Sequence, residues 1–299
     1  MHSMNLHKRF IDLSKPLVQI ATGTNPKLNV LENIRVVAFD FYGTLFISGV
    51  GDIGVDDGDF DLGVIERVLQ NSGVSIHSDD AVSECLRIYN EVVKRFKYDS
   101  KKKGIEYPEP DIRSIWQSVL MILRKSDRIK FRESSTLYEL ISVEFEARMN
   151  PVWPMPGLIE TLLFFENKGL ELGIISNSQF YTPIVLEALT GYSLQELGFS
   201  EELLHWSFEE KMKKPGLTFY ENYIKKVRAV VPDINPENIL YIGNDMLKDV
   251  YPAHTAGMKT ALFAGDSRSL KWHRDDERCQ NLEPDLIITE LLQLKDCIH

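Results

Sequence analysis

The sequence predicts a protein of the α/β class, in which helices cover both faces of a parallel sheet. Short apolar segments of the kind that form buried parallel strands alternate with segments whose apolar residues recur at helical spacing. Residues 49–150 interrupt this alternation and contain helical patterns alone. We therefore expect a Rossmann-like α/β core that carries an inserted all-helical domain.

Five segments have the near-continuous apolar character of strands that are buried on both faces. They cover residues 34–42, 170–177, 238–245, 259–263 and 284–291. The last of them is expected to lead into a final helix. Between the strands, residues 156–169 begin with a proline and end with a glycine, which are common helix start and stop signals. A further helical pattern covers residues 216–230.

The inserted region has its own regular pattern. Helices are expected near residues 61–71, 79–99, 111–126 and 134–149, and no convincing strand pattern lies between them. The chain is therefore divided into an N-terminal extension (1–33), an α/β core domain (34–48 and 151–299) and a helical insert (49–150). The extension is polar and has no clear structural signal, so its role is open at this stage.

The composition excludes several classes of function. The 299 residues include 44 acidic and 34 basic side chains, and the net charge of −10 disfavours nucleic acid as the main partner. No apolar run approaches the ~20 residues of a membrane span, and the N-terminus lacks the apolar segment of a secretory signal. Cys85, Cys279 and Cys297 fit neither a disulfide framework nor a metal site. We expect a cytoplasmic protein that acts on a small molecule, in an oligomeric state that the sequence leaves open.

Polar side chains follow three of the expected strands where these strands end. The first strand runs into Asp40 in the stretch VVAFDFYGTLF, residues 36–46. The other positions are Ser176 and Asn177 after the second strand, and Asn244, Asp245 and Asp249 after the third. Lys214 precedes the helix between the second and third strands. Because active sites of open parallel sheets form at the carboxyl ends of the strands, we expect these side chains to converge.

The chemistry of these residues indicates hydrolysis through a covalent intermediate. A carboxylate such as Asp40 can attack an electrophile and form an aspartyl intermediate. Hydroxyl and amide groups in a neighbouring loop can bind substrate oxygens, and a lysine offsets negative charge on the nucleophile and the substrate. Further carboxylates beside the nucleophile suit Mg²⁺, a hard cation that prefers oxygen ligands.

The motifs around these residues resemble those of the haloacid dehalogenase-like hydrolase superfamily. They are DFYGT at 40–44, SN at 176–177, KP at 214–215 and GNDMLKD at 243–249, in the order found in that family. The resemblance covers roughly residues 34–48 and 151–292. It implies that the helical insert is a type 1 cap over the active site, with hinges near residues 47–51 and 150–156.

The resemblance also implies a role for each motif residue. The expected catalytic residues are Asp40 as the nucleophile, Lys214 and Ser176. The expected substrate contacts are Thr44, Ser176, Asn177 and Lys214. The expected Mg²⁺ ligands are Asp40, Tyr42 through its backbone carbonyl, Asn244, Asp245 and Asp249, with the choice between Asn244 and Asp245 left open. Lys213 is expected to be solvated, because the family's lysine stands directly before the proline.

Two positions depart from the patterns of the family. Its phosphatases usually carry a second aspartate at the position of Tyr42, which protonates the leaving alcohol and later activates water. Tyrosine, with a reference pKa of about 10, is a poor replacement at neutral pH, and it resembles the 2-haloacid dehalogenases, whose halide leaving group needs no proton. Those dehalogenases need no metal and carry Ser and Asn in the fourth motif, whereas this chain keeps Asp245 and Asp249.

Three functions are compatible with this mixture of motifs. The favoured one is Mg²⁺-dependent hydrolysis of a small phosphorylated metabolite. The first alternative is 2-haloacid dehalogenation, in which Asp40 attacks the halogen-bearing carbon. The second is a catalytically weak member of the family that serves as a binding or scaffold protein. The substrate and the source of a general acid stay open.

Overall fold

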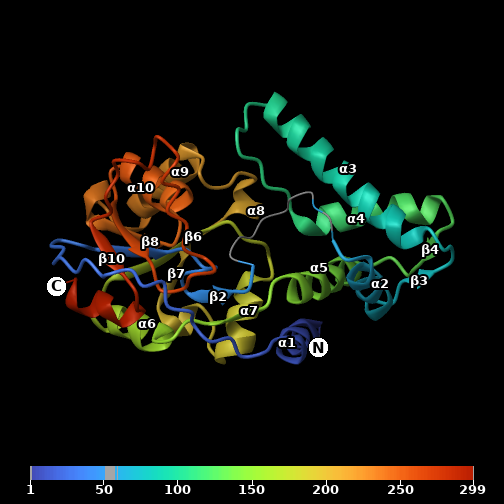
Figure 1. The fold of residues 1–299 in the computed structure, drawn as a ribbon, viewed down its shortest axis with the longest axis horizontal. Helices are drawn as coiled ribbons and strands as arrows, with labels where there is room; N and C mark the ends of the chain where they lie inside the picture. Colours follow the sequence, from blue (N-terminus) through green and yellow to red (C-terminus); the bar gives the residue numbers. More distant parts are fainter. Residues whose placement is uncertain (1, 51–57, 59, 299) are drawn as a thin grey trace.

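The computed structural model describes residues 2–50, 58 and 60–298 and is built around one six-stranded sheet (Figure 1). The strands lie in the order β10-β9-β8-β1-β6-β7, and every neighbouring pair is parallel. They are β1 (Val36–Phe39), β6 (Glu171–Ser176), β7 (Phe199–Trp206), β8 (Ile239–Gly243), β9 (Lys259–Phe263) and β10 (Leu286–Ile288). Because β1 lies inside the sheet, the chain adds strands on both sides of it.

The helices of the core lie between these strands in sequence. They are α6 (Leu158–Asn167), α7 (Thr182–Thr190), α8 (Ser207–Glu210), α9 (Leu217–Val230) and α10 (Tyr251–Thr255), with the 3-10 turns η1 (Gln195–Leu197), η2 (Pro236–Asn238) and η4 (Leu291–Asp296) and the π-helix η3 (Met246–Val250). The expected final helix is thus the short turn η4. Among the described residues, no helix is long and apolar enough to cross a membrane.

Both faces of the sheet are covered because both faces of its strands are apolar. Val36 and Ala38 of β1 are fully buried on one face, in a cluster with residues of α9 and α10. Val37 and Phe39 are fully buried on the other face, in a cluster with residues of α6 and α7. This two-sided burial explains the near-continuous apolar sequence of the strand, and it confirms the predicted α/β class.

The helices of the insert lie together beside the core (Figure 1). They are α2 (Leu62–Asn71), α3 (Ala81–Lys102), α4 (Ile112–Lys125) and α5 (Ser135–Met149), close to the expected positions. Two strands among them, β3 (Ser75–Ile76) and β4 (Ile129–Lys130), were not expected and pair antiparallel. Strands of two residues are too short to show the alternation that identifies a strand in sequence. The exact domain boundaries stay a prediction.

Two short strands connect the insert to the core. β2 (Phe46–Ser48) and β5 (Val152–Pro154) pair antiparallel where the chain leaves the core and returns to it. The Ser48 hydroxyl also donates a 2.8 Å hydrogen bond to Asn150 Oδ1, and both residues are buried. The hinges expected near residues 47–51 and 150–156 overlap this pair, although Gly51 lies outside the described residues. Whether the pair acts as a hinge stays a prediction.

The edge strand β7 was also not expected. It lies parallel to β6 at one end of the sheet. Ser200, Glu201 and Glu202 lie within it, and the two glutamates are exposed. Because an edge strand tolerates charged residues, β7 lacks the continuous apolar run by which the central strands were identified.

The N-terminal extension begins with a helix, α1 (His2–Leu13), that packs against α5 of the insert and α7 of the core (Figure 1). Phe10 is 1% exposed, and its ring centroid lies 6.2 Å from that of Tyr181. Arg9 forms an ion pair of 3.0 Å with Glu144, whose side chain is fully buried in α5. The extension therefore joins the insert to the core.

The rest of the extension runs along the edge strand β10. Lys27 and Ile287 exchange backbone hydrogen bonds of 2.8 and 3.0 Å. The Gln19 amide donates to the carbonyls of Gly265 and Thr289 at 2.7 and 2.9 Å. The segment thus covers an edge that would otherwise expose unpaired backbone groups.

Phe10→Ala tests whether α1 is an integral part of the fold. We expect the free energy of unfolding, measured by urea denaturation, to fall by about 3–5 kcal/mol, because a buried ring is replaced by a cavity. Ile11, its neighbour on α1, is 55% exposed. Ile11→Ala should therefore change the free energy of unfolding by less than ~0.5 kcal/mol. Equal losses in the two variants would contradict the packing role of α1.

Candidate active site

Asp40 lies at the carboxyl end of β1. Its backbone amide donates to the carbonyl of Ile242 at 2.8 Å, which continues the ladder between β1 and β8 by one residue. Asp40 is only 7% exposed. Because β6 and β8 flank β1, the segments that follow these two strands lie on either side of Asp40. This is the edge at which ligand sites of doubly wound sheets form.

A buried lysine bridges two carboxylates at this edge. The Lys214 ammonium lies 2.8 Å from Asp40 Oδ1 and 2.6 Å from Asp249 Oδ1. It also donates to the Tyr241 hydroxyl at 3.2 Å. Lys214 and Asp249 are 3% and 1% exposed. Since buried charges are stable only when paired, these contacts hold functional side chains from three segments together.

Burial and charge have opposing effects on the ionisation of this cluster. Burial raises the pKa of Asp40, the Lys214 ammonium lowers it and Asp249 raises it again, with a net value of about 6. Burial acts to lower the pKa of Lys214, but the carboxylates of Asp249 and Asp40 outweigh it, so this pKa is raised. Two carboxylates thus share one ammonium. When all three groups are ionised, the cluster carries a net negative charge that favours a cation nearby.

The segment that carries Lys214 is tied to the end of β6. Asn177 Oδ1 accepts a 2.9 Å hydrogen bond from the Lys214 backbone amide. The adjacent Ser176 hydroxyl is fully buried and has no hydrogen-bond partner of normal geometry among the described residues. It lies close enough to Asp40 to lower the pKa of that carboxyl. A buried hydroxyl with unused hydrogen-bonding capacity beside Asp40 is available to a ligand.

Asp249 and Asp245 organise the segment after β8. Asp249 Oδ2 accepts from the Asp245 backbone amide at 3.0 Å, and Asp249 Oδ1 lies 3.0 Å from the Tyr241 hydroxyl. Gly243 leaves room for this carboxylate, because a Cβ there would lie 2.3 Å from Asp249 Cγ. Asp245 Oδ1 accepts from two backbone amides at the start of η3, at 2.8 Å each. Its carboxylate therefore caps η3.

Asn244 links the first motif to the loop after β9. Its Oδ1 accepts from the Thr44 hydroxyl at 3.2 Å, and its Nδ2 donates to the Ser269 carbonyl at 2.7 Å. Gly43 lies against the same amide and has a φ of +84°. A Cβ at this position would lie only 2.7 Å from Asn244 Oδ1, which is too close. Both the backbone conformation and the close approach require glycine at this position.

The residues expected to hold Mg²⁺ supply oxygen donors of the kind that this cation prefers. Across the described residues, no group of three or more His, Cys, Asp or Glu side chains is arranged to hold a metal ion. The expected set includes three aspartates, Asp40, Asp245 and Asp249, and these do not form such a group. A cation held by Asp40 would therefore depend on the Tyr42 carbonyl and the Asn244 amide for its other protein ligands. Asp245 Oδ1 already faces His273 Nε2 at 3.0 Å in addition to capping η3. Within the part of the chain that the structure describes, Asn244 Oδ1 accepts one hydrogen bond, from Thr44, and keeps a lone pair.

Tyr42 places a phenol where the family's phosphatases usually have a carboxylate. It is 6% exposed, and its hydroxyl lies 3.0 Å from Thr182 Oγ1 at the start of α7. Burial and the charge of Glu146 raise the pKa of Tyr42 well above its usual value, against the effect of the Thr182 hydrogen bond. Tyr42 therefore keeps its proton at neutral pH and is a poor general acid or base.

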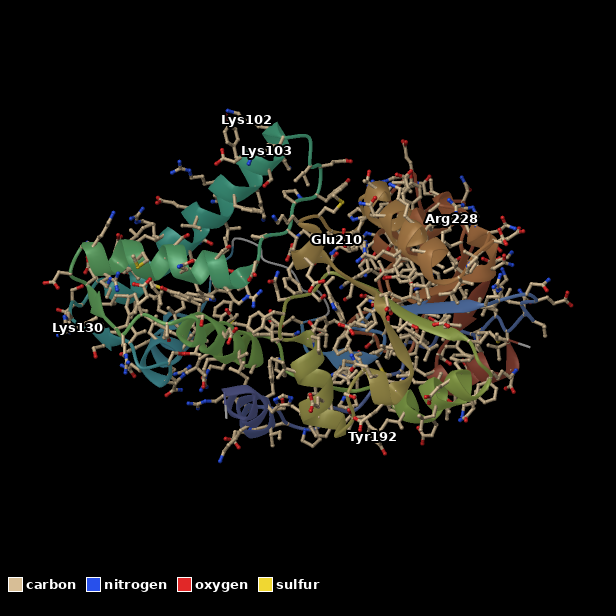
Figure 2. The ribbon with its side chains drawn as sticks, turned by 180° about the vertical axis from the view of Figure 1, so that it is seen from behind. Lys102, Lys103, Lys130, Tyr192, Glu210 and Arg228 are labelled. Carbon is tan, nitrogen blue, oxygen red and sulfur yellow. The ribbon has the colours of Figure 1, made fainter. Side chains whose placement is uncertain are left out.

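Two features of the site were not expected from the sequence. The first is Tyr241, whose hydroxyl contacts both Lys214 and Asp249. The sequence signal for it was a tyrosine inside the otherwise aliphatic strand ILYIG, because a buried tyrosine hydroxyl needs a hydrogen-bond partner. The expectation that Lys213 is solvated was wrong. Its side chain is 15% exposed and lies 3.0 Å from the buried carboxylate of Glu109 in the insert. By contrast, Lys102 and Lys103 at the end of α3 point away from the core (Figure 2).

Comparisons with known proteins identify the family of the chain. Residues 80–263, more than half of the chain, match the family described as haloacid dehalogenase-like hydrolase. A protein named glyceraldehyde 3-phosphate phosphatase from Methanothermobacter thermautotrophicus is 27% identical over 145 residues, which cover 48% of this chain and 58% of that protein. A protein of the same name from Pyrococcus furiosus is 23% identical over 271 residues, covering 90% of this chain and 95% of that protein.

Among solved structures, a 2-haloacid dehalogenase from Pseudomonas syringae pv. Tomato DC3000 is 17% identical, with a TM-score of 0.54. The likeness covers 88% of this chain and 97% of that one and, at this identity, shows the fold alone. The family match includes most of the insert and the motifs after β6 and β8, but it begins after Asp40. The chain is therefore a hydrolase that belongs to the haloacid dehalogenase-like family.

Proposed function

We propose that the protein is a Mg²⁺-dependent phosphatase of a small phosphorylated metabolite, with Asp40 as the nucleophile. The observation that carries the proposal is the buried cluster in which Lys214 bridges Asp40 and Asp249. The two relatives named glyceraldehyde 3-phosphate phosphatase support a phosphorylated substrate.

Asp40 attacks the phosphorus of the substrate from the end of β1. Its carboxylate forms a bond to phosphorus while the bond to the leaving alcohol breaks, which gives an aspartyl phosphate. Water then attacks the phosphorus, and phosphate and the free carboxylate are released. With a pKa of about 6, Asp40 is ionised at neutral pH, as a nucleophile must be.

Lys214 and Ser176 bind the phosphoryl oxygens. The raised pKa of Lys214 keeps it protonated, so it offsets the charge of both the nucleophile and the phosphoryl group. The Ser176 hydroxyl supplies a donor beside Asp40. Asn177 and Thr44, which were expected to contact substrate, act by holding the Lys214 backbone and the Asn244 amide.

Asp40, the Tyr42 carbonyl and Asn244 would hold Mg²⁺, and Asp249, which contacts Lys214, would add negative charge to the site. Asn244 is favoured over Asp245 because the Asp245 carboxylate already caps η3. When bound, the ion neutralises part of the charge on the phosphoryl group and orients it. Neutralisation is needed here because Lys214 is shared between two carboxylates.

In this proposal, residues 49–150 act as a cap. The loop between α3 and α4 contacts residues 211–213, directly before Lys214. The insert therefore reaches the carboxyl edge of the sheet, where substrate must bind. Closure of such a cap excludes water from the site and commits the bound substrate to reaction.

Tyr42 favours a second candidate function, 2-haloacid dehalogenation. A halide is a weak base and leaves without a proton, so a protonated Tyr42 is no disadvantage in that reaction. The carboxylates of Asp245 and Asp249 favour the metal-dependent reaction instead. A third candidate, a binding or scaffold protein of low activity, fits the missing acid and base but leaves the Asp40–Lys214–Asp249 cluster unexplained.

Phosphate release from p-nitrophenyl phosphate should require both Mg²⁺ and Asp40. We expect activity to be lost in chelator and restored by added Mg²⁺, and Asp40→Asn to lower it at least ~10³-fold. Asp12→Asn, at an exposed site on α1, is the matched control and should leave activity unchanged. Chloride release from a 2-haloacid that continues in chelator would support the dehalogenase instead. If the protein catalyses neither reaction, the binding or scaffold function becomes the favoured one.

The rate should depend strongly on the leaving group, because Tyr42 cannot readily protonate it. Nitrophenyl phosphate should turn over at least ~10²-fold faster than an alkyl phosphate, and Tyr42→Asp should raise alkyl phosphate turnover by up to ~10²-fold. Steady-state kinetics on matched esters measure both effects. Equal rates for the two esters in the wild type would show that another residue supplies the proton.

Tyr42→Phe tests the role of the Tyr42 hydroxyl separately from that of the backbone carbonyl, which the variant keeps. We expect the free energy of unfolding to fall by about 1 kcal/mol through loss of the Thr182 hydrogen bond, with phosphatase activity within ~2-fold of the wild type. Thr182→Val removes the other partner of this bond and should behave alike in denaturation and kinetics. A loss of activity above ~10-fold confined to Tyr42→Phe would assign the hydroxyl a catalytic role.

A further inference from the structure

The loop between α3 and α4, residues 103–111, pairs with the core segment that leads into Lys214. Backbone pairing joins residues 107–109 to residues 211–213. Two hydrogen bonds, from the Lys213 amide to the Tyr107 carbonyl at 2.8 Å and from the Glu109 amide to the Lys211 carbonyl at 3.3 Å, together form an antiparallel bridge between Pro108 and Met212. Figure 1 shows this loop descending from α3 towards α8 of the core. The insert thus contacts the residues directly before the proposed catalytic lysine.

Glu109 anchors this loop through its side chain. It is fully buried, and its carboxylate lies 3.0 Å from Lys213 Nζ and accepts from Gln179 Nε2 at 3.0 Å. Gln179 makes hydrogen bonds of 2.9 Å with two further backbone groups of the insert. Because Gln179 follows Ser176 by three positions in the sequence and Lys213 adjoins Lys214, Glu109 contacts both catalytic segments of the core.

A carboxylate buried in this way is stable only while its partners stay in place. Removing it from water costs several kcal/mol unless it is paired and hydrogen-bonded. Withdrawal of the loop would break the ion pair, the Gln179 bonds and the backbone pairing together. The loop is therefore expected to be either seated or released, rather than to slide through intermediate positions.

From these contacts we propose that Glu109 is a positioning residue for Lys214, which is aligned for catalysis at Asp40 when the insert loop is seated on the core. The inference rests on the proposed function for the catalytic role of Lys214. Glu109 fixes Lys213, and the next residue along the chain is the lysine itself. A displacement of ~1 Å of a catalytic group can lower the rate by ~10². Turnover thereby depends on the seating of the insert.

Glu109→Gln tests this proposal, because glutamine keeps an acceptor for Gln179 but loses the charge that pairs with Lys213. We expect kcat for p-nitrophenyl phosphate to fall ~10-fold while KM changes less than ~3-fold. Glu106→Gln, in an exposed part of the same loop, should leave both unchanged. In a Lys214→Gln background, Glu109→Gln should cause no further loss, since its effect passes through Lys214. A further ~10-fold loss in that background would overturn the proposal.

Hydrogen exchange provides a readout that does not depend on turnover. In folded Glu109→Gln, the amides of residues 211–214 and of Gly216 should exchange at least ~10-fold faster than in the wild type, and in Glu106→Gln they should not change. Unchanged exchange in Glu109→Gln would overturn the proposal even if activity falls. If the wild type hydrolyses no phosphate ester, the proposed function fails, whereas exchange still decides whether Glu109 holds the lysine segment. If Glu109→Gln does not fold, Gln179→Met removes a donor to the same carboxylate and carries the same expectations.

Discussion

The whole site depends on the burial of one ammonium between two carboxylates. Lys214, Asp40 and Asp249 are stable in a nearly water-free position only as a set, because removal of one partner from a buried pair costs about 3–5 kcal/mol. The surrounding residues support this set. Tyr241 contacts both Lys214 and Asp249, and Asn177 fixes the backbone of Lys214. The strand order brings these segments together, since β6 and β8 flank β1.

The insert contacts the core at several places, and these contacts would respond differently to a movement of the insert. β2 and β5 pair where the chain crosses between the two parts, and α1 packs against α5 and α7 on the same side of the molecule (Figure 1). The loop between α3 and α4 meets the core elsewhere, beside α8. If the insert moves about the β2–β5 pair, the contacts of α1 need change little, whereas those of Glu109 must break. Glu109 is thus one of the contacts that distinguish a seated from a released insert, together with the bonds of Pro110 and Ile112 to Gln179.

The sequence predicted those parts of the structure whose signals are local. The central strands are apolar on both faces, Asp40 and Ser176 stand at strand ends, and Asp249 lies in η3, the turn that follows β8. The helix α1 has an amphipathic pattern within a polar extension and was not predicted, and its buried residues pack on partners far along the chain, such as Tyr181. Glu109 has no sequence signal at all, because a glutamate in a loop is normally solvated. Its burial results from Lys213 and Gln179, whose proximity only the folded chain creates.

Tyr42 changes both the proton supply and the charge balance of the site. A carboxylate at this position would add a negative charge close to a cluster in which one ammonium already serves two carboxylates. The Tyr42 phenol is kept neutral by its raised pKa, so it adds no charge, and its hydroxyl hydrogen-bonds to Thr182. The cluster is therefore easier to keep intact before a cation binds, but the leaving group must depart without help from this position. In the proposed phosphatase, selectivity then follows the basicity of the leaving group, so that acyl and aryl phosphates react more readily than simple alkyl esters.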